Sequence, residues 1–447
     1  MRRLLLLLAL AAAGAPSGAT AQDSRPCSLL LTGVESGPRI TRMRSVELPS
    51  GARNTFVGGA VDATCEGQGN RLLADSAEHY AETGVLILFH NVRYTEPRVT
   101  INSDRMIYYT VEERLIAEGN VRGVTASGTR FNGPKMDYYR AKPGFREENF
   151  WIATGRPFVR MSPTEGGGAP GAGSDSTDLT ADFVRSQNDS LLYASGRVVL
   201  DREDMRATSD SAFVDNGIEF VRFIREPRIV GKGERPFELD GVLIEVWSRE
   251  RELQRVLASG DARAVSDSMT MTSDSIDLRF EEQQIARIFS WGGRAKAEGG
   301  PQLIEADSMD LRMPGQRLEA LHAVGSAVAF SDPDSLQIIT SERDWIVGDT
   351  LIARFEAIVD SLGASQTRMR DVEAIGNARA FYQLAPAGGT RGAPSLSYNR
   401  GRVIKVQFAD GEMSSVIVSE RASGLYLEPA TTDTAATAAR PARGRRP

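Results

Sequence analysis

The sequence predicts an all-β protein in which short antiparallel strands stack into an elongated repeat array. Three observations support this fold class: one seven-residue pattern recurs along the chain, a second pattern alternates with it, and polar turn-like runs separate the two. Helical periodicity is weak beyond the N-terminal residues. Residues 246–254 are the one later segment for which we allow a short helix, with another strand as the alternative.

The first pattern reads apolar, any, Ala, any, Gly, any, and then an apolar or small residue. Because side chains alternate between the faces of a strand, each copy predicts a strand with one small, apolar face and one mostly polar face. A recurring glycine predicts a bend at the same point of each strand. The close and looser copies are Leu115-Ala117-Gly119-Val121, Leu192-Ala194-Gly196-Val198, Val256-Ala258-Gly260-Ala262, Leu321-Ala323-Gly325-Ala327, Val372-Ala374-Gly376-Ala378, Trp151-Ala153-Gly155-Pro157 and Phe289-Trp291-Gly293-Ala295.

The second pattern is a small or polar residue, then Asp, then a short mixed strand. Asp75 and Asp104 are 29 residues apart, and Asp274 and Asp307 are 33 apart, so an Asp strand and a Gly strand form a unit of about 30 residues. Calcium-binding β-rolls instead repeat every nine residues with a glycine pair. We therefore expect these carboxylates to bond nearby backbone N–H groups at turns or strand edges.

The N-terminus predicts a secretory signal peptide over residues 1–21. Arg2 and Arg3 precede an apolar run, and Ala19-Thr20-Ala21 supplies a small-x-small cleavage site. The apolar run is shorter than the roughly 20 residues needed to cross a bilayer; an uncleaved N-terminal anchor is the alternative. The mature chain is therefore expected in the periplasm, where it could associate with the outer membrane.

The chain has two cysteines, Cys27 and Cys65, and in an oxidising compartment these are expected to form one disulfide. A free thiol or a metal pair is the alternative. The segments that we predict are a strand array over 22–162, a Gly/Ser/Pro-rich linker or insertion over 163–178, further repeats over 179–429 and a disordered, Arg-rich tail over 430–447.

The sequence contains no recognisable catalytic constellation. His79, His90 and His322 do not have metal-ligand spacing, and no P-loop, G-x-S-x-G or dinucleotide-binding motif occurs in a strand-turn-helix setting. The formal net charge is −6, from 53 basic and 59 acidic residues spread along the chain, which argues against a nucleic-acid partner. We therefore predict a binding protein without cofactor or metal rather than an enzyme.

The segment Ile101-Asn-Ser-Asp-Arg-Met106, followed by Tyr108 and by Leu115-Ile-Ala-Glu-Gly-Asn-Val121, resembles the organic solvent tolerance (OstA)-like family. That family includes the periplasmic bridge protein of lipopolysaccharide transport. The resemblance is strongest over about 54–160 and recurs to about 381. It implies a β-jelly-roll, or β-taco, with an open apolar groove that holds the acyl chains of lipid A. It also implies edge strands that stack on other envelope transport proteins or on further copies of the chain.

Alternation along the strands assigns the side chains that would line such a groove. They are Val99, Ile101, Met106, Tyr108, Leu115, Ala117, Val121, Leu192, Val198, Val256, Ala258, Leu321 and Val372. One alternative is a β-solenoid that acts as a surface adhesin or polysaccharide-binding scaffold, for which the interior would be packed shut. Another is a carbohydrate-active enzyme on a solenoid, for which carboxylates would cluster on one exposed face.

Overall fold

The computed structural model describes residues 29–32, 41–65, 69–161, 176–188, 190–233, 236–266, 269–359, 365–386, 391–409 and 412–429. The predicted signal peptide, Cys27, residues 163–175 of the predicted linker and the predicted tail over 430–447 lie outside these residues. Those predictions therefore remain predictions.

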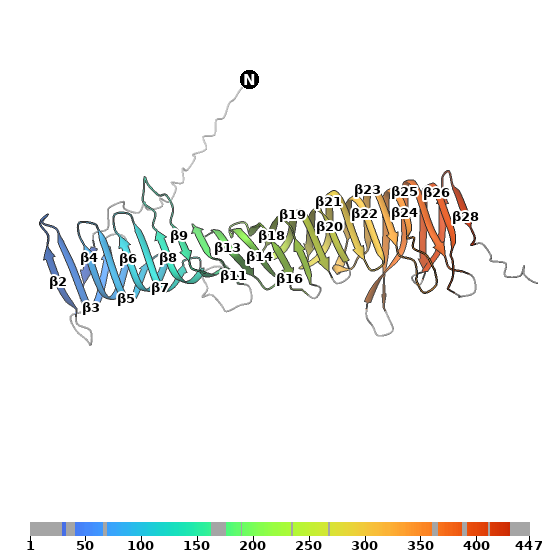
Figure 1. The fold of residues 1–447 in the computed structure, drawn as a ribbon. Helices are drawn as coiled ribbons and strands as arrows, with labels where there is room; N and C mark the ends of the chain where they lie inside the picture. The colour runs from blue at the N-terminus through green and yellow to red at the C-terminus, as the bar shows by residue number, and fades with distance from the viewer. Residues whose placement is uncertain are drawn as a thin grey trace, which may run out of the picture. The chain divides into compact units, whose positions relative to one another are not determined.

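The described chain consists of antiparallel strands, as the sequence predicts, and of one short 3₁₀ turn, η1 (Pro314–Gln316) (Figure 1). Residues 246–254, for which a short helix was allowed, are strand: β18 (Leu243–Arg249) and β19 (Glu252–Ser266) pair as a hairpin. Val246 and Val256 face each other across this pair and are both fully buried, so burial on one side of the sheet decides the conformation.

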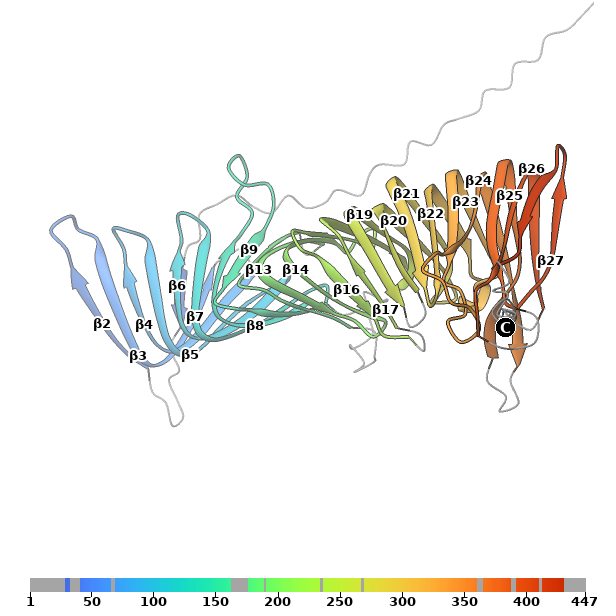
Figure 2. The same cartoon turned by 45° about the vertical axis from the view of Figure 1, so that its right-hand side comes forward.

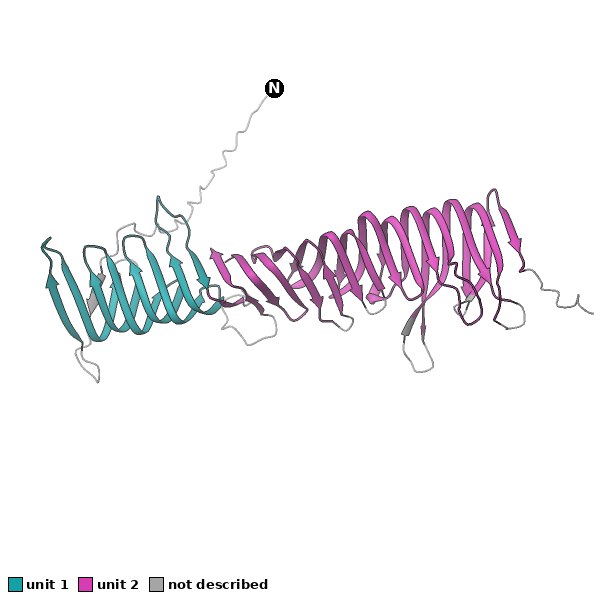
Figure 3. Ribbon diagram, viewed as in Figure 1, with its two compact units in different colours: residues 1–154 teal, residues 155–447 magenta. Residues whose placement is uncertain are grey.

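The chain divides into two compact units, residues 1–154 and 155–447 (Figure 3). The predicted linker begins later than this division, at Pro163, and its last residues enter β11. Unit 1 contains β1 (Leu29–Thr32), β2 (Arg42–Glu47), β3 (Arg53–Cys65), β4 (Asn70–Tyr80), β5 (Val85–Glu96), β6 (Val99–Tyr109), β7 (Arg114–Thr125), β8 (Arg130–Tyr139) and β9 (Phe150–Thr154).

Unit 2 begins with shorter strands and continues with long ones. Its elements before β18 are β10 (Phe158–Met161), β11 (Thr177–Thr180), β12 (Phe183–Gln187), β13 (Leu191–Asp201), β14 (Met205–Asp215), β15 (Phe220–Ile224), β16 (Arg228–Gly231) and β17 (Phe237–Asp240). After β19 follow β20 (Met269–Glu281), β21 (Gln284–Gly299), β22 (Gln302–Arg312), β23 (Ala320–Ser331), β24 (Asp344–Val359), β25 (Ser365–Leu384), β26 (Ser395–Ala409), β27 (Glu412–Ser419) and β28 (Ser423–Leu427).

Each long strand bends once, at a corner where the pairing register shifts. In β7 the corner is Gly119 and Asn120, with φ of 77° and 46°, and the register with β6 shifts between Asn102 and Arg105. The same pair of left-handed residues recurs at Gly196 and Arg197 in β13, where the register with β14 also shifts. The predicted glycine column therefore marks the corners.

The recurring Asp lies beside the glycine of the neighbouring strand. A Cβ atom added to Gly119 would lie 2.5 Å from Oδ2 of Asp104, so no larger residue fits there without a shift. Asn120 Nδ2 donates to Asp104 Oδ2 at 2.7 Å, and Arg197 Nε donates to Asp182 Oδ2 at 3.0 Å. These carboxylates thus accept from the side chain after the glycine, whereas the sequence led us to expect backbone N–H donors.

The corners divide the sheet of each unit into two leaves that face each other, which Figure 2 shows from the side. Leaf A contains residues 105–109, 114–118 and 135–139 of unit 1, and 243–249, 308–312, 320–324, 350–359, 365–375 and 403–409 of unit 2. Leaf B contains residues 92–96, 99–103 and 121–125 of unit 1, and 198–201, 302–306, 327–331, 344–348, 378–384 and 395–401 of unit 2.

Candidate functional site

The side chains assigned to the groove all point into the space between the leaves of their own unit. Their exposed fractions lie between 0% and 6%, so each is buried by its neighbours. Unit 1 holds Val99, Ile101, Met106, Tyr108, Leu115, Ala117 and Val121, and unit 2 holds Leu192, Val198, Val256, Ala258, Leu321 and Val372. Alternation therefore identified the inner faces, while the free space along them differs from place to place.

In unit 1 the space between the leaves is filled by large side chains of the protein itself. Trp151, Tyr94, Tyr108 and Phe131 are among the largest fully buried side chains of the described residues, and Phe131 stacks on Trp151 with 5.4 Å between ring centroids. Phe131 also covers Gly123, whose missing side chain leaves room for its ring. The predicted groove residues of unit 1 therefore belong to a packed core.

The open edge of unit 1 is closed by Arg140, which bridges the two leaves. Its Nε atom donates to Glu96 Oε2 at 2.9 Å, and its Nη1 atom donates to Glu113 Oε2 at 2.6 Å. Glu96 ends β5 in leaf B, whereas Glu113 lies in the turn that follows β6 in leaf A. All three side chains are at most 10% exposed, so the ion pairs are buried.

Three tyrosines complete this cluster, which we call the mouth clamp (Glu96, Glu113, Arg140, Tyr94, Tyr108 and Tyr138). Tyr94 donates to Glu96 at 2.8 Å, Tyr108 donates to Glu113 at 2.8 Å, and Tyr138 of leaf A donates to Glu96 across the gap. Burial raises the pKa of Tyr94 and of Tyr108, so both phenols stay protonated as donors. Burial opposes the charged form of Arg140, but the neighbouring Glu96 and Glu113 carboxylates raise its pKa.

Near its N-terminal end, unit 2 also has contacts that join the leaves. Arg202 follows β13 in leaf B. Its Nη1 atom donates to Ser248 Oγ at 2.9 Å, and its Nη2 atom donates to the carbonyl oxygen of Arg251 at 2.6 Å. Asp204 holds the same guanidinium through two further hydrogen bonds.

Towards the C-terminal end of unit 2 the leaves enclose an apolar cavity of about 150 Å³. A water molecule needs roughly 10–15 Å³ on this scale, so the space is on the order of ten times larger. Two of the predicted groove residues, Leu321 and Val372, line it. The other lining residues are Gln302, Ile304, Ala329, Phe330, Ser331, Asp344, Trp345, Ile346, Leu351, Ala353, Met369, Ala380, Phe381, Tyr382, Val406, Phe408 and Met413.

The register explains why space remains at this point. On leaf A, Leu321, Ala353 and Val372 are cross-strand neighbours that form one inward row. On leaf B, the opposing inward row contains Ala329, Ile346 and Ala380. Alanine alternates with a larger residue in both rows, so the two walls cannot meet as they do around Trp151 and Phe131 in unit 1. This apolar cavity is the candidate functional site.

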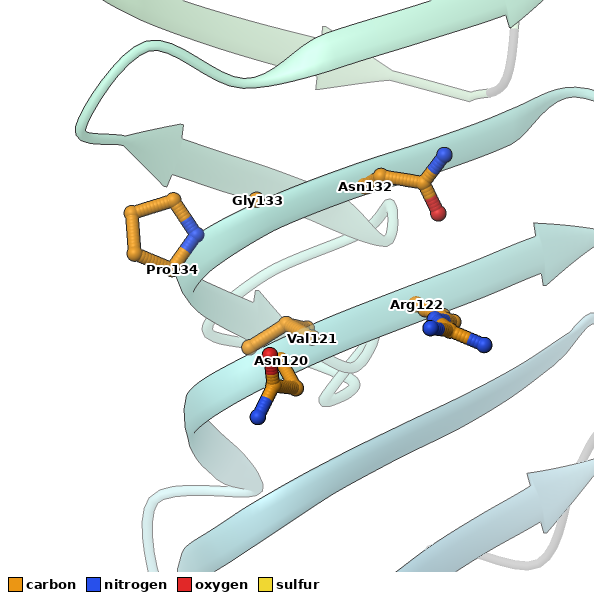
Figure 4. Close-up of a pocket in the computed structure, with 6 residues that line it drawn as sticks. All are labelled: Asn120, Val121, Arg122, Asn132, Gly133 and Pro134. Atoms are coloured by element: carbon orange, nitrogen blue, oxygen red, sulfur yellow. The ribbon is translucent and has the colours of Figure 1, made fainter.

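A second hollow, of about 620 Å³, is polar and open to solvent at one corner of unit 1. Figure 4 shows Asn120 and Arg122 on one strand and Asn132, Gly133 and Pro134 on its neighbour. At its corner β8 carries Pro134, whereas β6 carries Asp104 at the corresponding point. Val121, a predicted groove residue, also borders the hollow but is itself only 1% exposed.

Other chemistry is sparse in the part of the chain that the structure describes. No three His, Cys, Asp or Glu side chains there gather closely enough to hold a metal ion, and no described helix could cross a membrane. Burial lowers the pKa of His79, and His90 occupies a corner with φ of 60°. Cys65 ends β3, and its backbone lies opposite that of Leu29, which follows Cys27 by two residues. Because Cys27 lies outside the described residues, the predicted disulfide remains a prediction.

Of the mouth clamp, sequence reasoning found only Tyr108, and it missed Arg202. Glu96, Glu113 and Arg140 lie next to turns, where charged residues ordinarily face water, and 44 residues separate Glu96 from Arg140. The alternating Tyr94 and Glu96 were the only signal, because both fall on the inward positions of β5. Comparison of the sequence with protein-family models and with curated proteins finds no match.

Proposed function

We propose that the protein is a periplasmic lipid-binding protein that shields the acyl chains of lipopolysaccharide during its transport to the outer membrane. The single observation that carries this proposal is the apolar cavity between the leaves of unit 2. Each methylene group that leaves water for such a site contributes about 0.8 kcal/mol, so a few buried methylenes offset the cost of holding a lipid. Mostly apolar walls with a few polar groups are typical of small-molecule sites.

The edges of the two units support the transport part of the proposal. β2 pairs with β3 along one side, and all six of its residues are exposed. At the other end of the chain, β28 is also exposed along its whole length, including Leu425 and Leu427. Exposed strands of this kind pair with strands of other proteins. We propose that they dock other envelope transport proteins or further copies of the chain.

The adhesin or scaffold alternative expects an interior that is packed shut, and the core of unit 1 fits that expectation. The cavity in unit 2 favours lipid binding over it. The two functions differ in what the purified protein retains, because a scaffold would bind glycan without lipid. We propose no catalytic role.

Photo-crosslinking tests the proposal directly. A benzoylphenylalanine at Met369, at the rim of the cavity, is expected to capture purified lipopolysaccharide. The same probe at Val324, which is 48% exposed on the outer side of the same leaf, serves as the control and is expected to capture none. Equal capture at both positions, or none at Met369, would contradict the proposal.

A substitution that fills the cavity provides the second test. Ala353 is 1% exposed and lines the cavity, so Ala353→Phe is expected to reduce lipopolysaccharide binding about tenfold or more by occupying the space. Val324→Phe, at an exposed position on the outer side of the same leaf, is the matched control and should bind as the unchanged protein does. Circular dichroism of both variants verifies that the strands are retained.

A further inference from the structure

The inner wall of the cavity changes character on leaf B. Ile304, Ala329, Ile346 and Ala380 form an apolar row of cross-strand neighbours deep in the cavity. Two residues further along the strands, and therefore on the same face, lies a second row. In that row Gln302 is opposite Ser331, Ser331 is opposite Asp344, and Tyr382 is opposite Ser397. We call these five residues the polar row.

Leaf A stays apolar across the whole cavity. Outside its inward row of Leu321, Ala353 and Val372, the wall continues with Met369, Phe408 and Met413, and Phe408 is the cross-strand neighbour of Met413. The cavity therefore has one apolar wall and one wall that turns polar towards the open edge. A ligand with an apolar chain and a polar part on one side matches these walls.

Hydrogen bonds hold the polar row in place. Asp344 Oδ1 accepts from the backbone N–H of Gln383 at 3.1 Å and from Gln383 Nε2 at 3.2 Å. Asn399 Nδ2 donates to the Tyr382 hydroxyl at 3.2 Å and to Ser397 Oγ at 3.0 Å. The phenol and hydroxyl protons of Tyr382 and Ser397 are therefore directed away from Asn399 and can be donated to a ligand.

The charge of the cavity points to the kind of polar group that it would accept. Asp344 is an acid, and the described side chains that line the cavity include no Lys or Arg. Burial raises the pKa of Asp344, in keeping with a carboxylate that is partly removed from water. A phosphate placed beside it would add like-charge repulsion and would find no cation as a partner.

We infer that the polar row binds an uncharged, hydroxyl-bearing part of the ligand, such as a saccharide ring, while the attached acyl chain lies in the cavity. This inference rests on the proposed function and adds the class of head group that faces leaf B. Saccharide hydroxyls both donate and accept, as the carboxylate, amide and hydroxyl groups of the row require. Neighbouring strands lie about 4.8 Å apart, so the row from Gln302 to Ser397 spans on the order of 20 Å, which suits an extended sugar part.

Two detergents with the same alkyl chain separate this inference from the proposed function. Dodecyl maltoside and dodecyl phosphate, below their micellar concentrations, are titrated into the full-length protein and followed by calorimetry. We expect the maltoside to bind at least about tenfold more tightly. Equal affinities, or tighter binding of the phosphate, would overturn the inference and leave the proposed function standing. Absence of binding by both would overturn the proposed function, and the inference with it.

Substitution of Asp344 tests whether its negative charge is what disfavours a phosphate head group. Asp344→Asn removes the charge but keeps an oxygen that can accept from Gln383, so the fold should be retained. We expect it to improve dodecyl phosphate binding several-fold and to narrow the preference for the maltoside. Asp332→Asn is the matched control, because Asp332 is an exposed carboxylate outside the cavity that pairs with Arg343. An unchanged preference in Asp344→Asn would contradict the role given to this residue.

A second variant keeps the test independent of Asp344. Ser331→Ala removes one hydroxyl of the polar row and leaves the charge of the cavity unchanged. It is expected to weaken dodecyl maltoside binding several-fold and to leave dodecyl phosphate binding as it was. Equal losses for the two detergents would show that the row does not contact the sugar.

Discussion

Arg140 and Glu96 come from opposite leaves of unit 1, and their Nε and Oε2 atoms lie 2.9 Å apart in a buried ion pair. The pair closes the open edge of the packed core, because the same guanidinium also binds Glu113. Two carboxylates share one guanidinium there, and three phenols supply the remaining hydrogen bonds. A buried charge cluster of this kind is tolerated only while every member has its partners.

Removal of the guanidinium is therefore expected to destabilise unit 1 strongly. Arg140→Met leaves Glu96 and Glu113 buried without their cation and should lower the free energy of unfolding by about 3–5 kcal/mol. Hydrogen exchange of peptides from β5 to β8 in increasing urea measures this loss. Arg105→Met is the matched control, because the side chains of its pair with Glu118 are 40% and 35% exposed and the pair should contribute at most about 1 kcal/mol. Equal losses would show that the clamp is no stronger than a surface pair.

The corner of β7 is expected to reject any side chain at its first position. Gly119→Ala forces a residue with a Cβ atom into φ of 77° and against Asp104, which should cost about 1–3 kcal/mol. Gly58→Ala is the control, since no atom lies within 4 Å of the added Cβ. That variant should be neutral or slightly more stable. Thermal unfolding of the two variants measures the difference in stability. A Gly119→Ala variant as stable as the unchanged protein would refute the claim that this corner requires glycine.

Asp310 should contribute to the acid sensitivity of unit 2. Hydrogen bonds from Arg287, at 2.8 and 2.6 Å, lower the pKa of Asp310 in the folded state. A carboxyl whose pKa is lower in the folded chain stabilises the fold above its unfolded pKa of about 3.9, and the contribution is lost as the pH falls through the folded value. Asp310→Asn should therefore lose less stability between pH 7 and pH 3 than the unchanged protein. Urea unfolding at the two pH values measures the difference.

The predicted Cys27–Cys65 disulfide can be tested by peptide mapping without reduction. The backbone of Leu29 pairs with that of Cys65, so two residues separate Cys27 from a position beside its expected partner. We expect a linked peptide containing both cysteines in protein isolated from an oxidising compartment. Cys65→Ser should then cost about 3–4 kcal/mol in the loop-entropy description. Two free thiols in the mature protein would contradict this prediction.

Much of the fold could be read from the sequence because its determinants are local. The two-residue period of Leu115, Ala117 and Gly119 fixes which side of β7 is inward, and the glycine fixes where the strand bends. The partner of the corner Asp was harder to predict, since it depends on the register between strands. Asn120 reaches Asp104 only because the register shifts at that point.

The site itself could be predicted only in part. Leu115 and Val372 occupy equivalent inward positions in the repeat, yet Leu115 is in a packed core while Val372 lines a cavity. The difference arises from the residues on the opposite leaf, where large rings in one unit correspond to alanines in the other. Which side chains of the two leaves face each other is not encoded in any periodic pattern of the sequence. For the same reason Arg140 could not be assigned to Glu96, which lies 44 residues away.

The alternation of Asp corners with Gly corners constrains how the array could grow during evolution. Each corner needs a carboxylate from one strand and a left-handed pair from the next, as Asp104 and Gly119 illustrate. Insertion of a single strand would set two like corners side by side. Duplication of a whole hairpin preserves both conditions. The length of the hollow can therefore change in steps of two strands while its cross-section stays the same.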